Sequence, residues 1–496
     1  MKTIVIIGGG FSGMMTAAHL LRNTTSPTNP LQGRLQVIIV EPRHQPGAGV
    51  AYSTTHLEHR LNVDVRNMSA FPDHPDHFYH WLMEQTALEQ ISSERMPGGQ
   101  TQTPTITPEN YVPRAWYRDY LQNTFQNILD TINTEDNGVG VRFEHVQDCV
   151  VAVYVEVDYA AVTLASGITL CADAVVLASG NLPPRSPAIA DRSFYQNSSR
   201  YIENGWANDT NTLTTLNPDD SVLLIGTGLT TVDHLLTLRA QGHRGKIFTM
   251  SRHGLLPLSH LRQPTDAFEF TLDELPAEPR LLLRYIRDAA ETVLNAGGDW
   301  HSIINGLRPL VNALWQRATE TQRCQFLRHL LPYWTIYRHR IPADVANQIE
   351  TLQTSGQLTV VAGWLRAFEE HTEGVEVSIQ QRGTGETCRL NVQQVINCTG
   401  PSQDYRTVPH PLIRQLLTSG LCRPGSLNLG LDTDPHGALI DKYGQVSDRL
   451  FTLGPSRKGH LLESTAVPEL REQAFALAHH LLKLTDDKVA LSHYSR

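Results

Sequence analysis

Two parts of the chain repeat one pattern: a short β-rich run, a glycine turn, a stretch with apolar residues at helical spacing, and a second apolar run. The glycine turns are Gly8-Gly9-Gly10-Phe11-Ser12-Gly13 and Gly226-Thr227-Gly228-Leu229-Thr230-Thr231. The first runs cover residues 3–7 and 221–225, the helical stretches 14–22 and 231–239, and the second runs 35–41 and 246–250. Nearly continuous apolar strands are typical of a parallel sheet buried on both faces. The repeat predicts an α/β chain with two Rossmann-like dinucleotide-binding domains.

The first turn satisfies the pattern G-x-G-x-x-G and lies between a predicted strand and a predicted helix, as phosphate binding requires. Gly8 permits the tight turn, Gly10 lets the backbone approach a pyrophosphate, and Gly13 lets helix and strand pack closely. Phe11 and Ser12 complete a helix N-terminus whose N–H groups are free to bind phosphate. Glu41 ends the next strand, where its carboxylate can accept hydrogen bonds from ribose hydroxyls. The alternative is a plain glycine-rich turn with a surface glutamate.

The polar segment 23–33 explains why Glu41 lies further from the glycines than the usual spacing of about 20 residues.

The second turn keeps Gly226 and Gly228 but has Thr231 in the third position, which predicts slightly looser packing of helix on strand. Ser251 and Arg252 follow the next strand, where an NADH-binding domain usually has an acid. An arginine can pair with the 2′-phosphate of NADPH, whereas an acid would repel it. The sequence therefore favours NADPH over NADH. The alternative is that Arg252 is an ordinary solvated loop residue.

Composition and charge exclude several other classes of protein. The chain has 496 residues and a net charge of −9 without a basic stretch, so we expect no nucleic-acid partner. It has no run of about 20 apolar residues, and residues 3–7 are too short for a signal-peptide core. We therefore expect a cytoplasmic protein without a membrane association.

The cysteines and histidines give little indication of a metal site or of disulfide bonds. None of the six cysteines forms a C-x-x-C pair, which disfavours a disulfide framework, a zinc site and a redox-active dithiol. His74 is predicted to lie in a turn, and His77 and His80 on one face of the helix that follows. We expect no metal there.

Several further segments resemble one known family. The strand and turn at residues 174–181, with Ser179 and Gly180, resemble the A-T-G turn of flavoproteins with two dinucleotide-binding domains. Thr399 and Gly400 lie in a second copy of that turn. More specific are the segments Gly47-Ala48-Gly49-Val50-Ala51-Tyr52-Ser53, Tyr111-Val112-Pro113-Arg114, Arg338-His339-Arg340-Ile341-Pro342 and Thr465-Ala466-Val467-Pro468-Glu469. Over nearly the whole chain, the sequence resembles the bacterial FAD/NAD(P)-binding protein family, which is similar to flavin-containing and amine N-hydroxylating monooxygenases.

The resemblance implies a domain order and a set of cofactor contacts. FAD would bind residues 1–215 and 396–496, and the NAD(P) domain, residues 216–395 with a helical insertion, would be inserted between them. Residues 204–220 would be the linker. Gly454 and a helix N-terminus at Ala466 and Val467 would lie near the flavin. Polar contacts near the flavin, or else structural roles, are expected for Asn62, Ser69 and Arg114.

The expected function is that of an FAD-dependent oxidoreductase reduced by NADPH, a monooxygenase of a small molecule such as an amine or amino acid. Two alternatives stay open: an NADPH oxidoreductase that does not oxygenate, and a non-catalytic flavin-binding redox sensor. No catalytic acid or base stands out in the sequence. Arg338 and Arg340 are expected either to bind an anionic group of substrate or NADPH, or to form a solvated basic helix end.

Overall fold

The computed structural model describes residues 1–24, 35–87, 106–135, 140–206, 216–261 and 265–494. The chain divides into two compact units. Unit 1 comprises Met1–Thr55, Val63–Leu182 and Gln403–Arg496, and unit 2 comprises His56–Asn62 and Pro183–Ser402.

Apart from the short excursion His56–Asn62, the crossings between the units lie after Leu182 and after Ser402, whereas we expected them near residues 215 and 395. The reason is that β9 (Tyr201–Ile202) already pairs with β15 (Gln394–Asn397) in the sheet of unit 2. The expected linker, residues 204–220, therefore follows a strand of unit 2. Its middle part, 207–215, and most of the predicted loop 23–33 lie outside the described residues.

The main sheet of unit 1 has the order β17-β18-β7-β1-β2-β3. Its strands are β1 (Lys2–Ile7), β2 (Leu35–Val40), β3 (Arg142–Val146), β7 (Ala174–Leu177), β17 (Ala438–Ile440) and β18 (Val446–Thr452). All neighbours are parallel except β17 and β18. Ile7 lies in register with both Val40 and Leu177, so the first glycine turn meets the ends of β2 and β7 at one edge.

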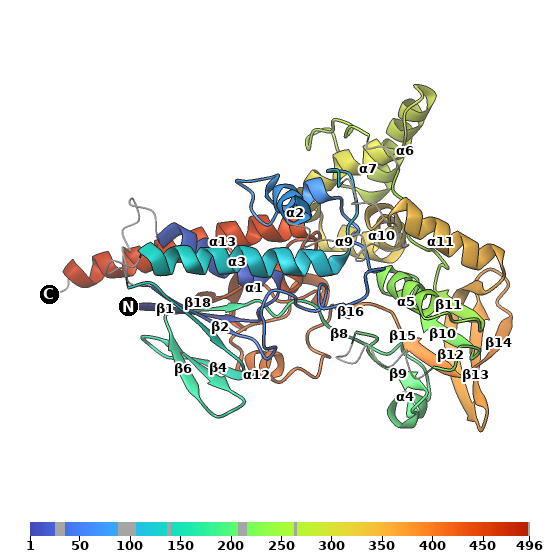
Figure 1. Ribbon diagram of the computed structural model, residues 1–496, viewed down its shortest axis with the longest axis horizontal. Helices are drawn as coiled ribbons and strands as arrows, with labels where there is room; N and C mark the ends of the chain where they lie inside the picture. The colour runs from blue at the N-terminus through green and yellow to red at the C-terminus, as the bar shows by residue number, and fades with distance from the viewer. Residues whose placement is uncertain (25–34, 88–105, 136–139, 207–215, 262–264, 495–496) are drawn as a thin grey trace. The chain divides into compact units, whose positions relative to one another are not determined.

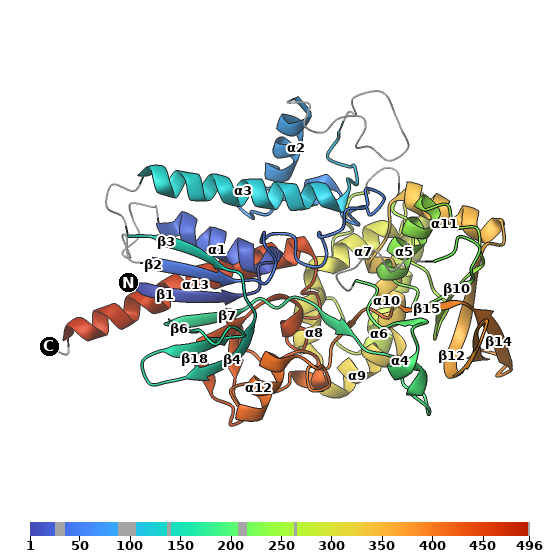
Figure 2. The ribbon, with the colours of Figure 1, turned by 60° about the horizontal axis from the view of Figure 1, so that its bottom comes forward.

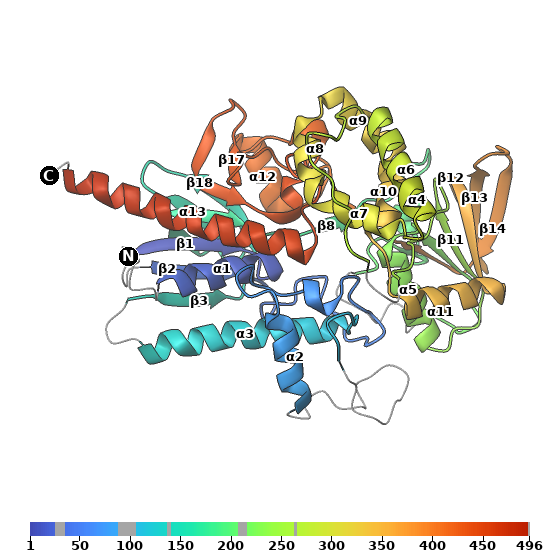
Figure 3. The ribbon, with the colours of Figure 1, turned by 90° about the horizontal axis from the view of Figure 1, so that it is seen from above.

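Helices cover one face of this sheet and a second sheet covers the other (Figure 2). On the helical face, α1 (Phe11–Thr24) packs against α3 (Arg114–Glu135) and α13 (Val467–Tyr494). Figure 1 shows α3 and α13 running side by side, and α1 is seen in Figure 3. The other face packs against α12 (Pro411–Ser419) and the antiparallel sheet β4 (Val150–Val155), β5 (Ala160–Leu164), β6 (Thr169–Ala172). Burial on both faces explains the continuous apolar runs of β1 and β2.

Unit 2 is built on a sheet with the order β14-β13-β12-β11-β10-β15-β9. The strands β10 (Val222–Ile225), β11 (Ile247–Ser251), β12 (Leu358–His371), β15 and β9 are parallel, and β13 (Gly374–Gln381) and β14 (Thr387–Val392) extend the sheet antiparallel. Helices α5 (Leu229–Ala240) and α11 (Ala343–Thr354) pack on one face, and α4 (Ser193–Asn197) on the other.

A helical insertion separates β11 from β12, as expected within residues 216–395. Its helices, gathered in yellow in Figure 3, enclose a small core of their own around Leu275, Ile303 and Leu307. They are α6 (Pro279–Asn295), α7 (His301–Leu307), α8 (Val311–Arg317), α9 (Glu320–His329) and α10 (Leu331–Arg338). Within the described ranges, no helix is long and apolar enough to cross a membrane.

Candidate functional site

The glycines of the first turn occupy positions that a side chain could not. Gly8 has φ +106°, and a Cβ there would lie 2.4 Å from the carbonyl oxygen of Ala178. A Cβ on Gly13 would lie 1.9 Å from the carbonyl oxygen of Gly8, so α1 rests directly on the turn. Helix α1 begins at Phe11, within the turn, rather than at Met14 as the periodicity suggested. Its N-terminal N–H groups are therefore placed at the edge where β1, β2 and β7 end.

Glu41 is buried against this turn, with 5% of its surface exposed, so the interpretation as a surface glutamate is wrong. Its Oε2 accepts the backbone N–H of Gly9 at 2.8 Å. Its Oε1 accepts the backbone N–H of Arg43 at 3.1 Å and the Arg43 guanidinium at 3.3 Å. An ionised carboxylate has about four lone-pair positions, so acceptor capacity remains for ribose hydroxyls.

The N-terminus of α13 lies close to the N-terminus of α1. Gly454 has φ +79°, and a Cβ there would be 3.5 Å from the Ser12 hydroxyl and 3.2 Å from the side chain of Leu470 on α13. Ala466 directly precedes α13, and its carbonyl accepts the N–H groups of Glu469 and Leu470 at 3.1 and 2.9 Å. The helix N-terminus expected at Ala466 and Val467 is present, because α13 starts at Val467, and Gly454 stands two residues after the end of β18.

Several buried hydroxyls in unit 1 lack a hydrogen-bond partner among the described residues, and those of Ser464 and Tyr117 lie in or beside the elements of this site. Ser464, three residues before α13, is fully buried, and its Oγ is unpaired. Tyr117 on α3 is also fully buried with an unpaired hydroxyl, and its ring contacts Phe11 of the glycine turn at 6.2 Å and Tyr52 at 4.8 Å between centroids. Buried unpaired hydroxyls are costly, so a polar ligand here would stabilise the unit.

The segment around Gly47 and Gly49 covers the glycine turn from the other side. Gly47 donates its N–H to the carbonyl of Gly9 at 2.6 Å, and a Cβ on Gly49 would lie 3.2 Å from Cα of Gly10. Tyr117, Ser464 and these two glycines were not among the predicted contacts, although all four stand in or close to the motifs that carry the resemblance. The open turn, the held carboxylate and the unpaired hydroxyls fit a bound dinucleotide in unit 1.

The three polar residues expected near the flavin have different surroundings. The hydroxyl of Ser69 donates to the carbonyl of His74 at 2.6 Å and accepts the N–H of Phe71 at 3.2 Å, so it holds a turn. Asn62 belongs to unit 2, where its carbonyl lies 3.0 Å from Nε2 of His260. Arg114 begins α3. Burial raises the pKa of Tyr52, and the charge of Arg114 partly offsets this rise. A flavin contact of these side chains stays a prediction.

The second glycine turn is held by hydroxyl groups. Gly226 has φ +126°, and its carbonyl accepts the hydroxyls of Thr231 at 2.7 Å and Thr249 at 2.6 Å. The fully buried Thr231 thus holds the turn where the first turn has Gly13, and the looser packing of α5 stays a prediction. Gly228 has no atom within 4 Å of its Cβ position. The backbone there is open to a phosphate.

Basic side chains gather after β11. The hydroxyl of Ser251 accepts the N–H of Gly254 and the hydroxyl of Thr227, each at 2.9 Å, and so ties the loop to the glycine turn. Arg252 is exposed, and its carbonyl accepts the Arg382 guanidinium at 3.3 Å. The pKa of His253 is lowered by burial and by the charges of Arg382 and Arg252. The arrangement fits an anionic group, and the role of Arg252 stays a prediction.

The two turns that resemble A-T-G precede the crossings between the units. Gly180 and Gly400 have φ +63° and +81°, and no atom lies within 4 Å of either Cβ position. Thr399 donates its hydroxyl to the side chain of Asn397 at 2.7 Å. Ser179 lies in the first turn, after β7. The short strands β8 (Leu182–Pro184) and β16 (Pro401–Ser402) pair where the chain crosses.

Arg338 and Arg340 do not form a solvated helix end, because only 6% and 8% of their surfaces are exposed. Arg340 donates to the side-chain oxygen of Asn305 at 2.7 Å. Burial, followed by the charge of Arg340, lowers the pKa of His260 to about 3. Unit 2 therefore holds two buried positive charges beside a neutral imidazole.

The fold and the two turns together define a flavoprotein with two dinucleotide-binding domains. Residues 5–182 match the family model described as FAD-NAD(P)-binding, and the chain carries the FAD/NAD(P)-binding domain of this family. The predicted fold class is confirmed, and the predicted FAD/NAD(P)-binding domain is confirmed over residues 5–182.

The chain also resembles individual proteins along its length. It is 22% identical over 522 residues to an uncharacterised protein of Mycobacterium tuberculosis, covering 97% of this chain and 95% of that one. An L-aspartate N-monooxygenase (nitrosuccinate-forming) of Streptomyces davaonensis is 26% identical over 296 residues, which are 53% of this chain and 42% of that protein. The solved structure of L-lysine 6-monooxygenase from Pseudomonas syringae has a TM-score of 0.63 at 15% identity, covering 98% of this chain and 100% of that one.

Proposed function

We propose that this chain is an FAD-dependent, NADPH-reduced monooxygenase that oxygenates the nitrogen of a small amine. The observation that carries the proposal is the site in unit 1: a glycine turn free of side chains, the Glu41 carboxylate fixed on Gly9, and unpaired buried hydroxyls on Tyr117 and Ser464. The similarity to an L-aspartate N-monooxygenase and to the fold of an L-lysine 6-monooxygenase supports the oxidative half of the reaction.

The residues of unit 1 fit FAD in named roles. The N–H groups at the start of α1 would bind the pyrophosphate, and Glu41 would accept the ribose hydroxyls. The N-terminus of α13 at Ala466 and Val467 would stabilise negative charge on the flavin ring. When bound, FAD supplies the chemistry of hydride acceptance from NADPH and of oxygen transfer.

The residues of unit 2 would hold NADPH. Gly226 permits the tight turn, Gly228 leaves room for the pyrophosphate, and Arg252, with Arg382 beside it, would pair with the 2′-phosphate. NADH is the alternative nucleotide for this domain. Because NADH lacks the 2′-phosphate, Arg252 would not add to its affinity.

We propose an amino acid or an amine as the substrate class, because the named relatives act on such molecules. One is the L-aspartate N-monooxygenase, 26% identical over 296 residues, and another is the L-lysine 6-monooxygenase, which shares the fold. Guanidinium groups bind carboxylates in a fixed geometry, and a role of the buried Arg338 and Arg340 in binding a substrate carboxylate stays a prediction.

The cysteines argue against disulfide reduction as the function. All six lie within the described ranges and are free, and none is near another as a C-x-x-C pair. Burial raises the pKa of Cys398 and of Cys422 to about 12, so neither is a thiolate near neutral pH.

The test is product analysis with isotopically labelled oxygen. The FAD-loaded protein would be supplied with NADPH, labelled O₂ and a panel of amino acids and amines. The proposal expects one labelled oxygen atom in the nitrogen product of at least one amino acid, with NADPH consumed in step. NADPH consumption with no labelled product for any panel member would instead support an oxidoreductase that does not oxygenate, and no consumption would support the redox sensor.

A further inference from the structure

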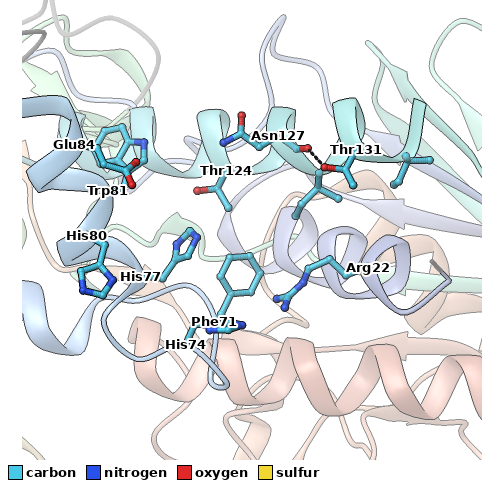
Figure 4. Close-up of a pocket in the computed structure, with 12 residues that line it drawn as sticks. Arg22, Phe71, His74, His77, His80, Trp81, Glu84, Thr124, Asn127 and Thr131 are labelled. Carbon is cyan, nitrogen blue, oxygen red and sulfur yellow. Dashed lines mark hydrogen bonds between the residues drawn. The ribbon is translucent and has the colours of Figure 1, made fainter. Parts of the chain in front are cut away.

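A cavity of about 610 Å³ lies in unit 1, apart from every residue expected to bind a dinucleotide (Figure 4). It lies between the end of α1, the helix α2 (His77–Ala87) and the middle of α3. The residues that line it are Arg22, Phe71, His74, His77, His80, Trp81, Glu84, Thr124, Asn127, Ile128, Thr131 and Ile132.

The two ends of this pocket carry opposite charges. Figure 4 shows Arg22 at one end and Glu84 at the other, with Phe71, His77 and Thr124 between them. The guanidinium of Arg22 lies 4.5 Å from the centroid of the Phe71 ring and pairs with Asp73 at 3.1 Å, so it is held in place. Glu84 is exposed on α2, lines the pocket and makes no ion pair with a described residue.

The middle of the pocket has apolar walls. Phe71 and Trp81 are buried, with 3% and 9% of their surfaces exposed, and Ile128 and Ile132 line the pocket from α3. The indole N–H of Trp81 donates to the side chain of Asn123 at 3.0 Å, so its polar atom is satisfied outside the cavity. These surfaces suit an apolar body rather than a hydrated ion.

Thr124 provides an independent sign of a ligand. It lines the pocket with 6% of its surface exposed, and its hydroxyl has no hydrogen-bond partner among the residues that the structure describes. An unpaired buried hydroxyl destabilises the empty protein, and a ligand with an acceptor or donor at that point would remove the cost.

The imidazoles do not make this pocket a metal site. Nδ1 of His77 is hydrogen-bonded to the hydroxyl of Tyr120 at 2.8 Å. Burial, then the charges of His74, Arg22 and His80, lower the pKa of His77 to about 4, so it is a neutral polar wall near pH 7. In the described ranges, no three histidine, cysteine or acidic side chains gather as metal ligands.

We propose that this pocket binds a small zwitterion with an apolar body, whose carboxylate meets Arg22 and whose ammonium group meets Glu84. The ammonium group would give Glu84 an ion-pair partner that no described residue provides, and the carboxylate would add a contact to the guanidinium that Asp73 already holds in place. This site is separate from the proposed oxygenation site, and the proposal does not rest on that function.

The test uses three probes that share one chain length: 6-aminohexanoate, hexanoate and hexylamine. Each would be titrated calorimetrically into the FAD-loaded protein, with 4-aminobutanoate and 8-aminooctanoate added to cover other lengths. The proposal expects one of the amino acids to bind about tenfold or more tightly than the acid or the amine of its own length, since one charge-assisted contact corresponds to at least that ratio. Equal binding of the three probes, or no binding of any amino acid, would overturn it.

Matched variants locate the binding. Arg22→Gln should abolish the preference for the amino acid over the amine, and Glu84→Gln should abolish its preference over the acid. Asp130→Asn removes an exposed carboxylate of α3 that does not line the pocket, and this variant should bind the amino acid as the parent protein does. Loss of binding in Arg338→Gln, but not in Arg22→Gln, would assign the binding to unit 2 and overturn the proposal.

Thr124→Val separates ligand binding from folding. Valine matches threonine in shape and lacks the hydroxyl, so the empty variant should resist urea as well as the parent or better. The same variant should bind the amino acid several-fold more weakly. Unchanged affinity would show that the hydroxyl of Thr124 does not face the ligand, so that its lack of a partner would no longer support a ligand in this pocket.

Discussion

The carboxylate oxygen Oε2 of Glu41 accepts the backbone N–H of Gly9 at 2.8 Å, and this bond joins the end of β2 to the glycine turn that follows β1. The acid that would bind ribose is therefore fixed by the loop that would bind the pyrophosphate. Because both groups belong to one hydrogen-bonded unit, a change at Glu41 should affect the dinucleotide more than the fold around it.

Glu41→Gln should weaken FAD binding by about tenfold to a hundredfold, because charge-assisted hydrogen bonds contribute about 1.5–3 kcal/mol. The amide retains one acceptor oxygen but loses the charge that also holds Arg43. Fluorescence titration of the apoprotein with FAD would measure the change. Glu144→Gln, on the neighbouring strand β3 and exposed, is the matched control and should bind FAD normally.

Alanine at Gly13 should lower the stability of the protein, whereas alanine at Gly228 should weaken the binding of NADPH. A Cβ at Gly13 would lie 1.9 Å from the carbonyl oxygen of Gly8, so Gly13→Ala should lower the unfolding temperature of the protein without ligands. Gly228 has open space at its Cβ position and φ −90°, so Gly228→Ala should unfold as the parent does. It should nevertheless bind NADPH more weakly, because the methyl group occupies the space where the pyrophosphate would lie. Equal unfolding temperatures for the two variants would contradict this account.

Arg252→Ala should raise the KM for NADPH by about tenfold or more and leave the KM for NADH nearly unchanged, because only NADPH carries a 2′-phosphate. Steady-state oxidation of each nucleotide would give both values. Arg366→Ala, an exposed arginine on β12, serves as the control for loss of surface charge. A parallel loss with both nucleotides would exclude the role of Arg252 at the 2′-phosphate.

His19 should make unit 1 sensitive to acid. Burial, then the charge of Arg22, lowers the pKa of His19 from 6.5 to about 4, and its ring contacts Phe71 and Phe475 in the interior. Between these pH values the unfolded chain binds a proton that the folded chain does not, so stability falls as pH falls through this window.

Urea unfolding at pH 7.5 and at pH 4.5 would measure the effect. His19→Leu should lose less stability than the parent over that interval, by about 2–3 kcal/mol, since one pKa unit corresponds to about 1.4 kcal/mol. His371→Gln changes an exposed histidine of β12 and should follow the parent. An identical pH dependence in parent and His19→Leu would show that His19 does not titrate on unfolding.

Much of the fold could be predicted because local patterns carry it. The apolar runs of β1 and β10 and the glycines after them follow from the geometry of a strand, a turn and a helix close together in sequence. The crossings between the units could not be placed, because the two-residue strand β9 exists only through its pairing with β15, almost 200 residues later. No local property of Tyr201 and Ile202 indicates that partner.

The residues of the candidate site could also be predicted only in part. Gly8, Gly13 and Glu41 could be found because their spacing reflects a known phosphate-binding geometry. The unpaired hydroxyls of Tyr117 and Ser464 could not, because burial without a partner depends on packing between distant segments. The buried guanidiniums of Arg338 and Arg340 also contradict what a basic sequence suggests, since charged side chains are seldom buried.

The central claim is that one chain binds both cofactors and passes electrons from NADPH to FAD. Its most direct test is to add NADPH to the FAD-loaded protein without oxygen and to follow the visible absorbance of oxidised flavin. The account predicts that the absorbance bleaches as one equivalent of NADPH is consumed, and that Arg252→Ala requires more NADPH for the same rate. Flavin that stays oxidised in excess NADPH would contradict the account.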